Sequence, residues 1–180
     1  MPLKTINIEN HAYFVTSKVY RNINLFIYEE FCNILIDNLN FYRNKFKVKI
    51  LGYVIMLDHL HTIIWPQGKD SISDIMRDFK KQTAKEIIKI IREGGIRNPA
   101  KTIGRIANPT FSEILETFTV NTQKQTYKLW QSRNWIENIY SVKFLKQKLN
   151  YIHLNPVRAK LVKNAADYKY SSYRNYYFKW

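Results

Sequence analysis

Two histidines, His59 and His61, stand one residue apart inside the apolar stretch Val54 to Ile64. Alternate residues of a β-strand face the same way, so the two imidazoles are expected to project in parallel, roughly 6.5 to 7 Å apart along the backbone. An isolated pair at this spacing is more often a packing feature than a site. Titratable rings among so many apolar neighbours cost stability unless they bind something. The setting therefore favours a metal site.

A second candidate group is Tyr151, which lies in a segment with apolar residues at helical spacing. The apolar stripe that we expect to face the core consists of Val142, Leu145, Leu149 and Ile152. At 100° per residue, Tyr151 lies about 120° from the middle of this stripe, on the side of Phe144, Lys148 and Asn155. Such a tyrosine is either a rim residue whose hydroxyl meets water or a nucleophile. His153 falls nearer the apolar side, which predicts a structural role.

The strands and helices that position these groups are predicted from periodicity and capping residues. A strand is expected within residues 11–20, followed by a helix from Asn24 to about Tyr42. Residues 46–65 form two antiparallel strands that turn near Leu57 and Asp58. The other expected helices begin at Ser71, span 112–118, and run from Val142, capped by Ser141, until Pro156 ends the last one. Residues 127–140 are ambiguous between strand and loop.

The chain is strongly basic, with 29 Lys and Arg against 14 Asp and Glu and a formal net charge of +15. This balance favours a polyanionic partner, although ribosome-associated and membrane-surface proteins can be equally basic. Cys32 is the only cysteine, which excludes an internal disulfide and a multi-cysteine zinc site. The start has no signal-peptide pattern, and no apolar run reaches membrane-spanning length. We expect one compact domain over residues 1–180, in a cytoplasmic protein.

Three stretches offer candidate contacts for a nucleic acid. The helix from Ser71 carries a basic face that includes Arg77 and Lys81, which is either a solvated surface or one that follows phosphates. A glycine-containing, acid-free stretch over residues 94–108 is expected to be an exposed loop or insertion and adds Arg97 and Lys101. The aromatic, basic tail over about 166–180 includes Tyr173. Aromatic side chains can stack on exposed bases while cations follow the backbone.

Four segments in the same order carry a resemblance to a known family. They are YFVTSKVYR from Tyr13, GYVIMLDHLHTIIWP from Gly52, YIHLNPVRAKLV from Tyr151 and DYKYSSYRNY from Asp167. Together they resemble the HUH single-tyrosine transposases, and most closely the REP-associated tyrosine transposase branch. The resemblance covers most of the chain except about 94–127, which is similar to no family segment and is interpreted as an insertion.

The resemblance implies an α+β, ferredoxin-like sandwich with the histidines at the centre of an antiparallel sheet and helices packed on one face. It further implies Tyr151 as the catalytic nucleophile and His59, His61 and Asn155 as metal ligands, with Asn155 where many relatives have glutamine. The ion that it implies is Mg²⁺ or Mn²⁺. Two imidazoles and an amide would also suit Zn²⁺.

The expected reaction is cleavage and rejoining of single-stranded DNA. A tyrosine hydroxyl has a pKa near 10, so a divalent cation is needed to polarise the scissile phosphate and favour attack. Attack would leave a 5′-phosphotyrosine and a free 3′-hydroxyl, and resealing would need no nucleotide cofactor. We add Lys148 as a catalytic candidate that contacts the phosphate or favours the phenolate. Arg158 joins Arg77, Lys81, Arg97, Lys101 and Tyr173 as DNA-binding candidates.

Relatives recognise imperfect palindromes, so a hairpin-forming strand is the expected partner of a monomer or homodimer. One alternative is a protein that binds DNA hairpins without catalysis. Another is a rolling-circle-type nickase, although such relatives arrange their histidines differently and often carry a helicase for which this chain has no room. A basic RNA- or ribosome-associated domain would explain the charge but leave the two histidines without a purpose.

Overall fold

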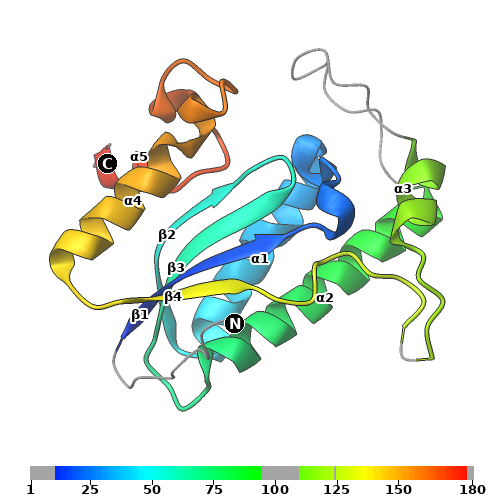
Figure 1. The fold of residues 1–180 in the computed structure, drawn as a ribbon, viewed down its shortest axis with the longest axis horizontal. Coiled ribbons are helices and arrows are strands. Elements are labelled where there is room, and N and C mark those ends of the chain that lie inside the picture. The colour runs from blue at the N-terminus through cyan, green and yellow to red at the C-terminus, as the bar shows by residue number, and fades with distance from the viewer. Residues whose placement is uncertain (1–10, 95–109, 124, 178–180) are drawn as a thin grey trace.

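A four-stranded antiparallel sheet forms the centre of the computed structural model, which describes residues 11–94, 110–123 and 125–177. The strand order is β2-β3-β1-β4. The strands are β1 (Ala12–Lys18), β2 (Val48–Ile55), β3 (His59–Pro66) and β4 (Trp135–Ile139). This is the order of a ferredoxin-like fold, and it confirms the predicted hairpin and the central position of the histidine strand (Figure 1).

Two long helices, α1 (Glu29–Lys45) and α2 (Ile72–Glu93), cover one face of this sheet (Figure 1). Both are amphipathic, and their apolar sides meet the sheet residues Tyr13, Val15 and Leu60 in the larger core. Cys32 is fully buried in that core, and burial raises the pKa of its thiol. α2 starts where the sequence predicts, because the Ser71 side chain accepts a hydrogen bond from the Asp74 N–H.

The helix that carries Tyr151, α4 (Val142–Arg158), covers the opposite face of the sheet. A smaller core joins Ile152 of α4 to Phe14, Val54 and Ile63 of three different strands. The predicted packing on one face is therefore right for α1 and α2 and wrong for α4. The difference follows from strand alternation, because the histidines share a face with Phe14 and only a helix on that face can contact them.

Two predicted helix limits are wrong. Asn24 does not cap α1, because the chain first makes two short turns, η1 (Tyr20–Asn22) and η2 (Leu25–Ile27). The second turn buries Leu25 and Phe26, so α1 begins at Glu29. Pro156 does not end α4, which continues to Arg158. A proline in the final turn costs a single backbone bond, and the Ala159 N–H still reaches the Asn155 carbonyl at 2.9 Å.

Val142 departs from the predicted stripe, since 70% of it is exposed. It begins α4, and the first turn of that helix stands away from the sheet in Figure 1. The Ser141 cap is confirmed, because its hydroxyl accepts a hydrogen bond from the Phe144 N–H. The ambiguous stretch resolves into β4 preceded by irregular chain. The remaining elements are α3 (Phe111–Phe118), η3 (Ala165–Asp167) and α5 (Tyr173–Tyr177).

None of the helices in the described ranges combines the length and apolar content that a membrane crossing requires.

Candidate active site

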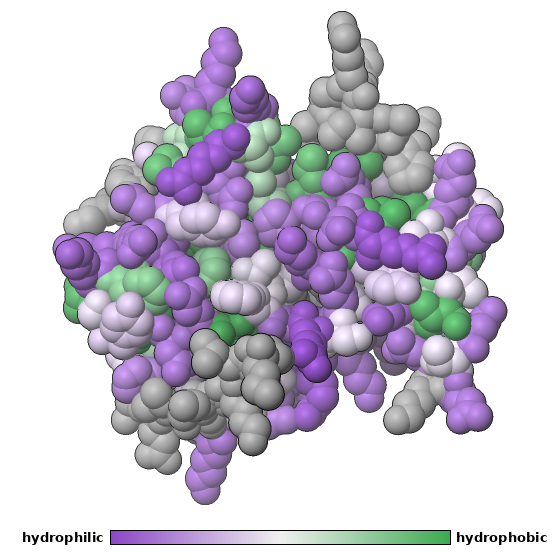
Figure 2. Space-filling model, viewed as in Figure 1, coloured by the Kyte–Doolittle hydropathy of each residue, from purple (hydrophilic) through white to green (hydrophobic). Residues whose placement is uncertain are grey.

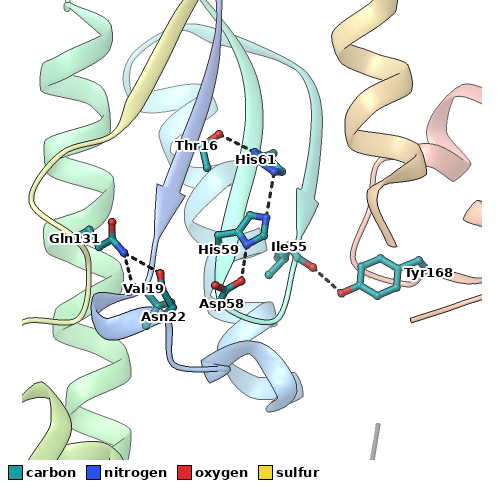
Figure 3. Close-up of polar contacts among 9 residues, drawn as sticks. All are labelled: Thr16, Val19, Asn22, Ile55, Asp58, His59, His61, Gln131 and Tyr168. Atoms are coloured by element: carbon teal, nitrogen blue, oxygen red, sulfur yellow. Dashed lines mark hydrogen bonds and ion pairs between the residues drawn. The ribbon is translucent and has the colours of Figure 1, made fainter. Parts of the chain in front are cut away.

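The two histidines of β3 point their outer ring nitrogens at each other. His59 Nε2 lies 3.1 Å from His61 Nε2. Each ring is fixed through its other nitrogen: His59 Nδ1 lies 2.5 Å from the Asp58 carboxylate, and His61 Nδ1 lies 2.8 Å from the Thr16 hydroxyl (Figure 3). Because a carboxylate only accepts, His59 Nδ1 carries the proton, and its Nε2 lone pair faces the gap.

This pair fits two ligands of a single metal ion. Nitrogens bound at about 2.0 to 2.1 Å lie about 2.9 Å apart at a right angle and about 3.3 Å apart in a tetrahedron. The 3.1 Å separation falls between these limits. His61 is 5% exposed, and burial, followed by the charges of His59 and Lys18, lowers its pKa to about 3. A neutral imidazole with a free lone pair is the form that binds metal.

The described residues bring no group of three or more His, Cys, Asp or Glu together in a way that could hold a metal ion. Oxygen ligands such as an amide, a water molecule or a substrate phosphate would suit Mg²⁺ or Mn²⁺. Asn155, the predicted third ligand, lies one turn after Tyr151 on the same helix and is partly buried.

Tyr151 packs against His61, one member of this pair. Its ring centroid lies 5.3 Å from that of His61 and 5.8 Å from that of Phe14, and both contacts are edge-to-face. Phe14 in turn stacks on His61, with centroids 5.3 Å apart. Phe14 thus supports both candidate groups from below, while 39% of Tyr151 stays exposed to an incoming substrate. A helical tyrosine and two strand histidines therefore converge, as the sequence predicts.

Lys148 lies one turn before Tyr151 and makes an ion pair that the sequence did not predict. Its Nζ lies 2.6 Å from Glu137 Oε2 and 4.6 Å from the centre of the Phe14 ring. Glu137 is the β4 partner of Phe14, so register alone brings this carboxylate to the site. Arg158 follows Tyr151 near the end of the same helix, and its guanidinium carbon lies 5.7 Å from the centre of the Tyr151 ring.

The other predicted contacts lie away from the histidine pair. Arg77 and Lys81 are on α2, beyond the opposite face of the sheet. Tyr173 packs edge-to-face on His153, with ring centroids 5.5 Å apart. Arg97 and Lys101 lie outside the described residues. His153 is buried 2.9 Å from the Ser172 hydroxyl, and burial lowers its pKa to about 4, in agreement with a structural role.

Sequence reasoning missed Phe14, Thr16 and Glu137. All three lie on the histidine face, at positions where β1 pairs with β3 and β4. Thr16 pairs directly with His61, and Phe14 pairs with both Ile63 and Glu137. These three residues could have been predicted only from the order in which the strands pair. No short segment of the sequence shows that order.

Comparison with known proteins identifies the family. A family model described as "Transposase IS200 like" matches residues 5–95, half of the chain. The chain belongs to this family.

Two relatives carry more specific names. The REP-associated tyrosine transposase of Escherichia coli (strain K12) is 24% identical over 127 residues, which are 69% of this chain and 54% of that protein. The chain thus spans about half the length of the curated relative that it matches. A solved structure described as "REP associates tyrosine transposase bound to a REP hairpin" superposes with a TM-score of 0.66 at 19% identity. That match covers 96% of this chain and 82% of the other, and it supports the fold.

Proposed function

We propose that this protein is a metal-dependent single-stranded DNA transposase that cuts and rejoins DNA through a 5′-phosphotyrosine on Tyr151. The observation that carries the proposal is the convergence of Tyr151 on the His59 and His61 pair, with the Tyr151 and His61 ring centroids 5.3 Å apart. Membership of the IS200-like transposase family supports the same chemistry.

Tyr151 supplies the nucleophilic oxygen. The described geometry orients its ring through Phe14 and His61 and leaves 39% of the residue exposed. Its attack on phosphorus forms a tyrosyl phosphodiester and releases the 3′-oxygen as a hydroxyl after proton uptake. Because the number of phosphodiester bonds is unchanged, the reverse attack by a 3′-hydroxyl rejoins DNA without a nucleotide cofactor.

His59, His61 and Asn155 are the residues that would hold the divalent ion, for which we propose Mg²⁺ or Mn²⁺. When bound, such an ion polarises the scissile phosphate and offsets the charge that develops on its oxygens. Asp58 and Thr16 are positioning residues, because they fix the ring orientation of His59 and His61. Lys148 is a candidate for contact with the phosphate, and Glu137 competes with the phosphate for its charge.

A hairpin-bearing single strand is the substrate that we propose. The solved relative is described as bound to a REP hairpin, and a chain with a net charge of +15 suits a polyanion. Arg158, whose guanidinium carbon lies 5.7 Å from the centre of the Tyr151 ring, would contact the DNA backbone near the cut. Arg77 and Lys81 would contact DNA farther from it. Tyr173 packs edge-to-face on His153, so we give it a smaller part in DNA binding than the basic residues.

The test is covalent trapping on a labelled hairpin oligonucleotide with Mn²⁺, analysed on a denaturing gel. We expect Tyr151→Phe to abolish the protein–DNA adduct and to keep DNA binding, because only the hydroxyl is removed. Tyr140→Phe is the matched control, since Tyr140 is 72% exposed near the start of the same helix and should form the adduct normally.

Chelation of the metal should also abolish the adduct in the wild type. An adduct that survives in Tyr151→Phe would assign the nucleophile elsewhere. DNA binding without any adduct in the wild type would favour the non-catalytic alternative. Cleavage without rejoining to an added 3′-hydroxyl strand would favour a nickase.

A further inference from the structure

A long groove runs between α2 and the chain that leads into β4, residues 125–134, beyond the sheet face that α1 and α2 cover. Its volume is about 1250 Å³. The lining along α2 extends from Ser73 to Arg92, which corresponds to roughly 29 Å at 1.5 Å per residue. The proposed chemistry leaves this groove unused.

Eight cationic side chains line the groove, and none of its described lining residues is acidic. They are Arg77, Lys80, Lys81, Lys85, Lys89, Arg92, Lys128 and Arg133. Within the described part of the chain, only Arg77 among them forms ion pairs with carboxylates, those of Asp74 and Asp78. The groove therefore concentrates uncompensated positive charge. Hydrophilic side chains dominate the face of the molecule that Figure 2 shows.

One of these cations holds the two walls together. Lys80 Nζ lies 2.5 Å from the Gln131 carbonyl and 3.2 Å from Asn134 Oδ1. Burial, followed by the charge of Lys128, lowers the Lys80 pKa to about 8. Trp130 adds a second link, since its indole N–H donates to the Thr83 hydroxyl at 3.0 Å. These hydrogen bonds attach residues 130–134 to α2, so the two sides of the groove are held in a fixed arrangement.

We propose that this groove binds the phosphate backbone of a single DNA strand that continues into the tyrosine–histidine site. Regularly spaced cations match the phosphates, and a single strand also exposes bases that can contact Ala84 and Tyr127 in the same groove. Binding of the strand stands on the groove alone. Its continuation into the site rests on the proposed function.

Strand β4 separates the groove from the candidate active site. Ile136 lines the groove, whereas its neighbours Trp135 and Glu137 point to the other face of the sheet. Trp135 pairs with Thr16, which pairs with His61, so Trp135 lies roughly 10 Å from the histidine strand, two strand spacings away. It is 69% exposed. A DNA strand that leaves the groove crosses β4, the edge strand of the sheet, and passes over Trp135 to reach Tyr151.

The first test measures binding of a labelled oligothymidylate of about 30 nucleotides, longer than the roughly 4 to 16 that one single-strand-binding fold covers. The chelator EDTA is present, so cleavage does not enter. We expect the double variant Lys81→Glu with Lys85→Glu to bind at least about tenfold more weakly. The dependence of log K on log salt should become shallower by about 0.7 for each phosphate that the variant no longer neutralises.

The matched control is Lys143→Glu with Lys146→Glu, which changes the net charge equally on exposed positions of α4. Thermal unfolding establishes that both variants are folded. Equal weakening in the two variants would reduce the effect to net charge and overturn the groove proposal. Preference of the groove for a duplex over the single strand would overturn it as well.

The second test places the cleavage site at one end of the oligonucleotide, with the flank either 5′ or 3′ of the cut. A DNA strand that crosses β4 runs in a single 5′-to-3′ direction, so only one of the two flanks reaches the groove. The variant Lys81→Glu with Lys85→Glu should therefore slow adduct formation with that flank only. Equal slowing with both flanks would overturn the continuous path. If the wild type forms no adduct with either flank, the proposed function fails, while the binding result still decides the groove.

Discussion

At the scale of single residues, the site depends on how two imidazoles are held. Asp58 and Thr16 each occupy one ring nitrogen, so the two remaining Nε2 atoms are directed into one gap. His61 is buried and stays neutral, which removes the competition between a proton and a metal ion at physiological pH. Phe14 contacts His61 and Tyr151 together, and so couples the proposed nucleophile to the proposed metal site through packing.

Lys148 and Glu137 allow a test of the role of the lysine cation. If Lys148 contacts the scissile phosphate, Lys148→Met should slow adduct formation about tenfold, because one charge-assisted hydrogen bond of about 1.4 kcal/mol is removed. Glu137→Gln should leave the rate equal or higher, because it weakens the competing ion pair. The measurement is the single-turnover rate with saturating DNA and metal. Equal slowing in the two variants would show that the pair is structural.

At the scale of elements, the sheet presents the histidines and α4 presents the tyrosine. Gly52 of β2 is where the helix approaches the sheet closely. A methyl group there would lie 2.7 Å from Leu149 Cδ2 and 2.9 Å from Ile152 Cδ1. Both side chains belong to α4, next to Tyr151 and Lys148. The position of Tyr151 therefore depends on a residue with no side chain.

Gly52→Ala should displace α4 slightly and lower the adduct rate more than the stability. Side-chain ends can yield, so we expect the free energy of unfolding to fall by about 1 kcal/mol, at the low end of overpacking. The adduct rate should fall by at least about tenfold, since catalytic geometry tolerates little displacement. Denaturant unfolding and single-turnover trapping measure the two effects. An unchanged rate in a destabilised variant would separate this packing from the site.

The sequence predicted those elements whose signals are local. Ser71 and Ser141 cap their helices as expected, and the hairpin places His59 and His61 in β3. It could not predict which face α4 covers, because that follows from the order of strands far apart in the chain. The sequence did not show that Glu137 is the partner of Lys148, because this contact also depends on the face of the sheet that α4 covers. The Asn24 prediction failed because burial of Leu25 and Phe26 outweighs local capping.

At the scale of the whole molecule, charge and chemistry are separated. Eight cations gather in the groove on one side of the sheet edge, whereas the histidine pair on the other side is partly enclosed and is held by the Asp58 carboxylate. Salt weakens the attraction between exposed cations and phosphates by screening their charges. It weakens the contacts of a buried group such as His61 much less. Capture of DNA and its cleavage should therefore respond differently to ionic strength.

We expect the affinity of the wild type for single-stranded DNA to fall by at least about tenfold between about 50 and 200 mM salt, because bound cations release counterions from the phosphates. The adduct rate at saturating DNA should change less than about threefold, since salt screens the contacts of buried groups such as His61 much less. Anisotropy titrations and single-turnover trapping at the two salt concentrations measure the pair. A rate that falls in parallel with affinity, even at saturation, would mean that the cations act in the chemical step and not only in holding the strand.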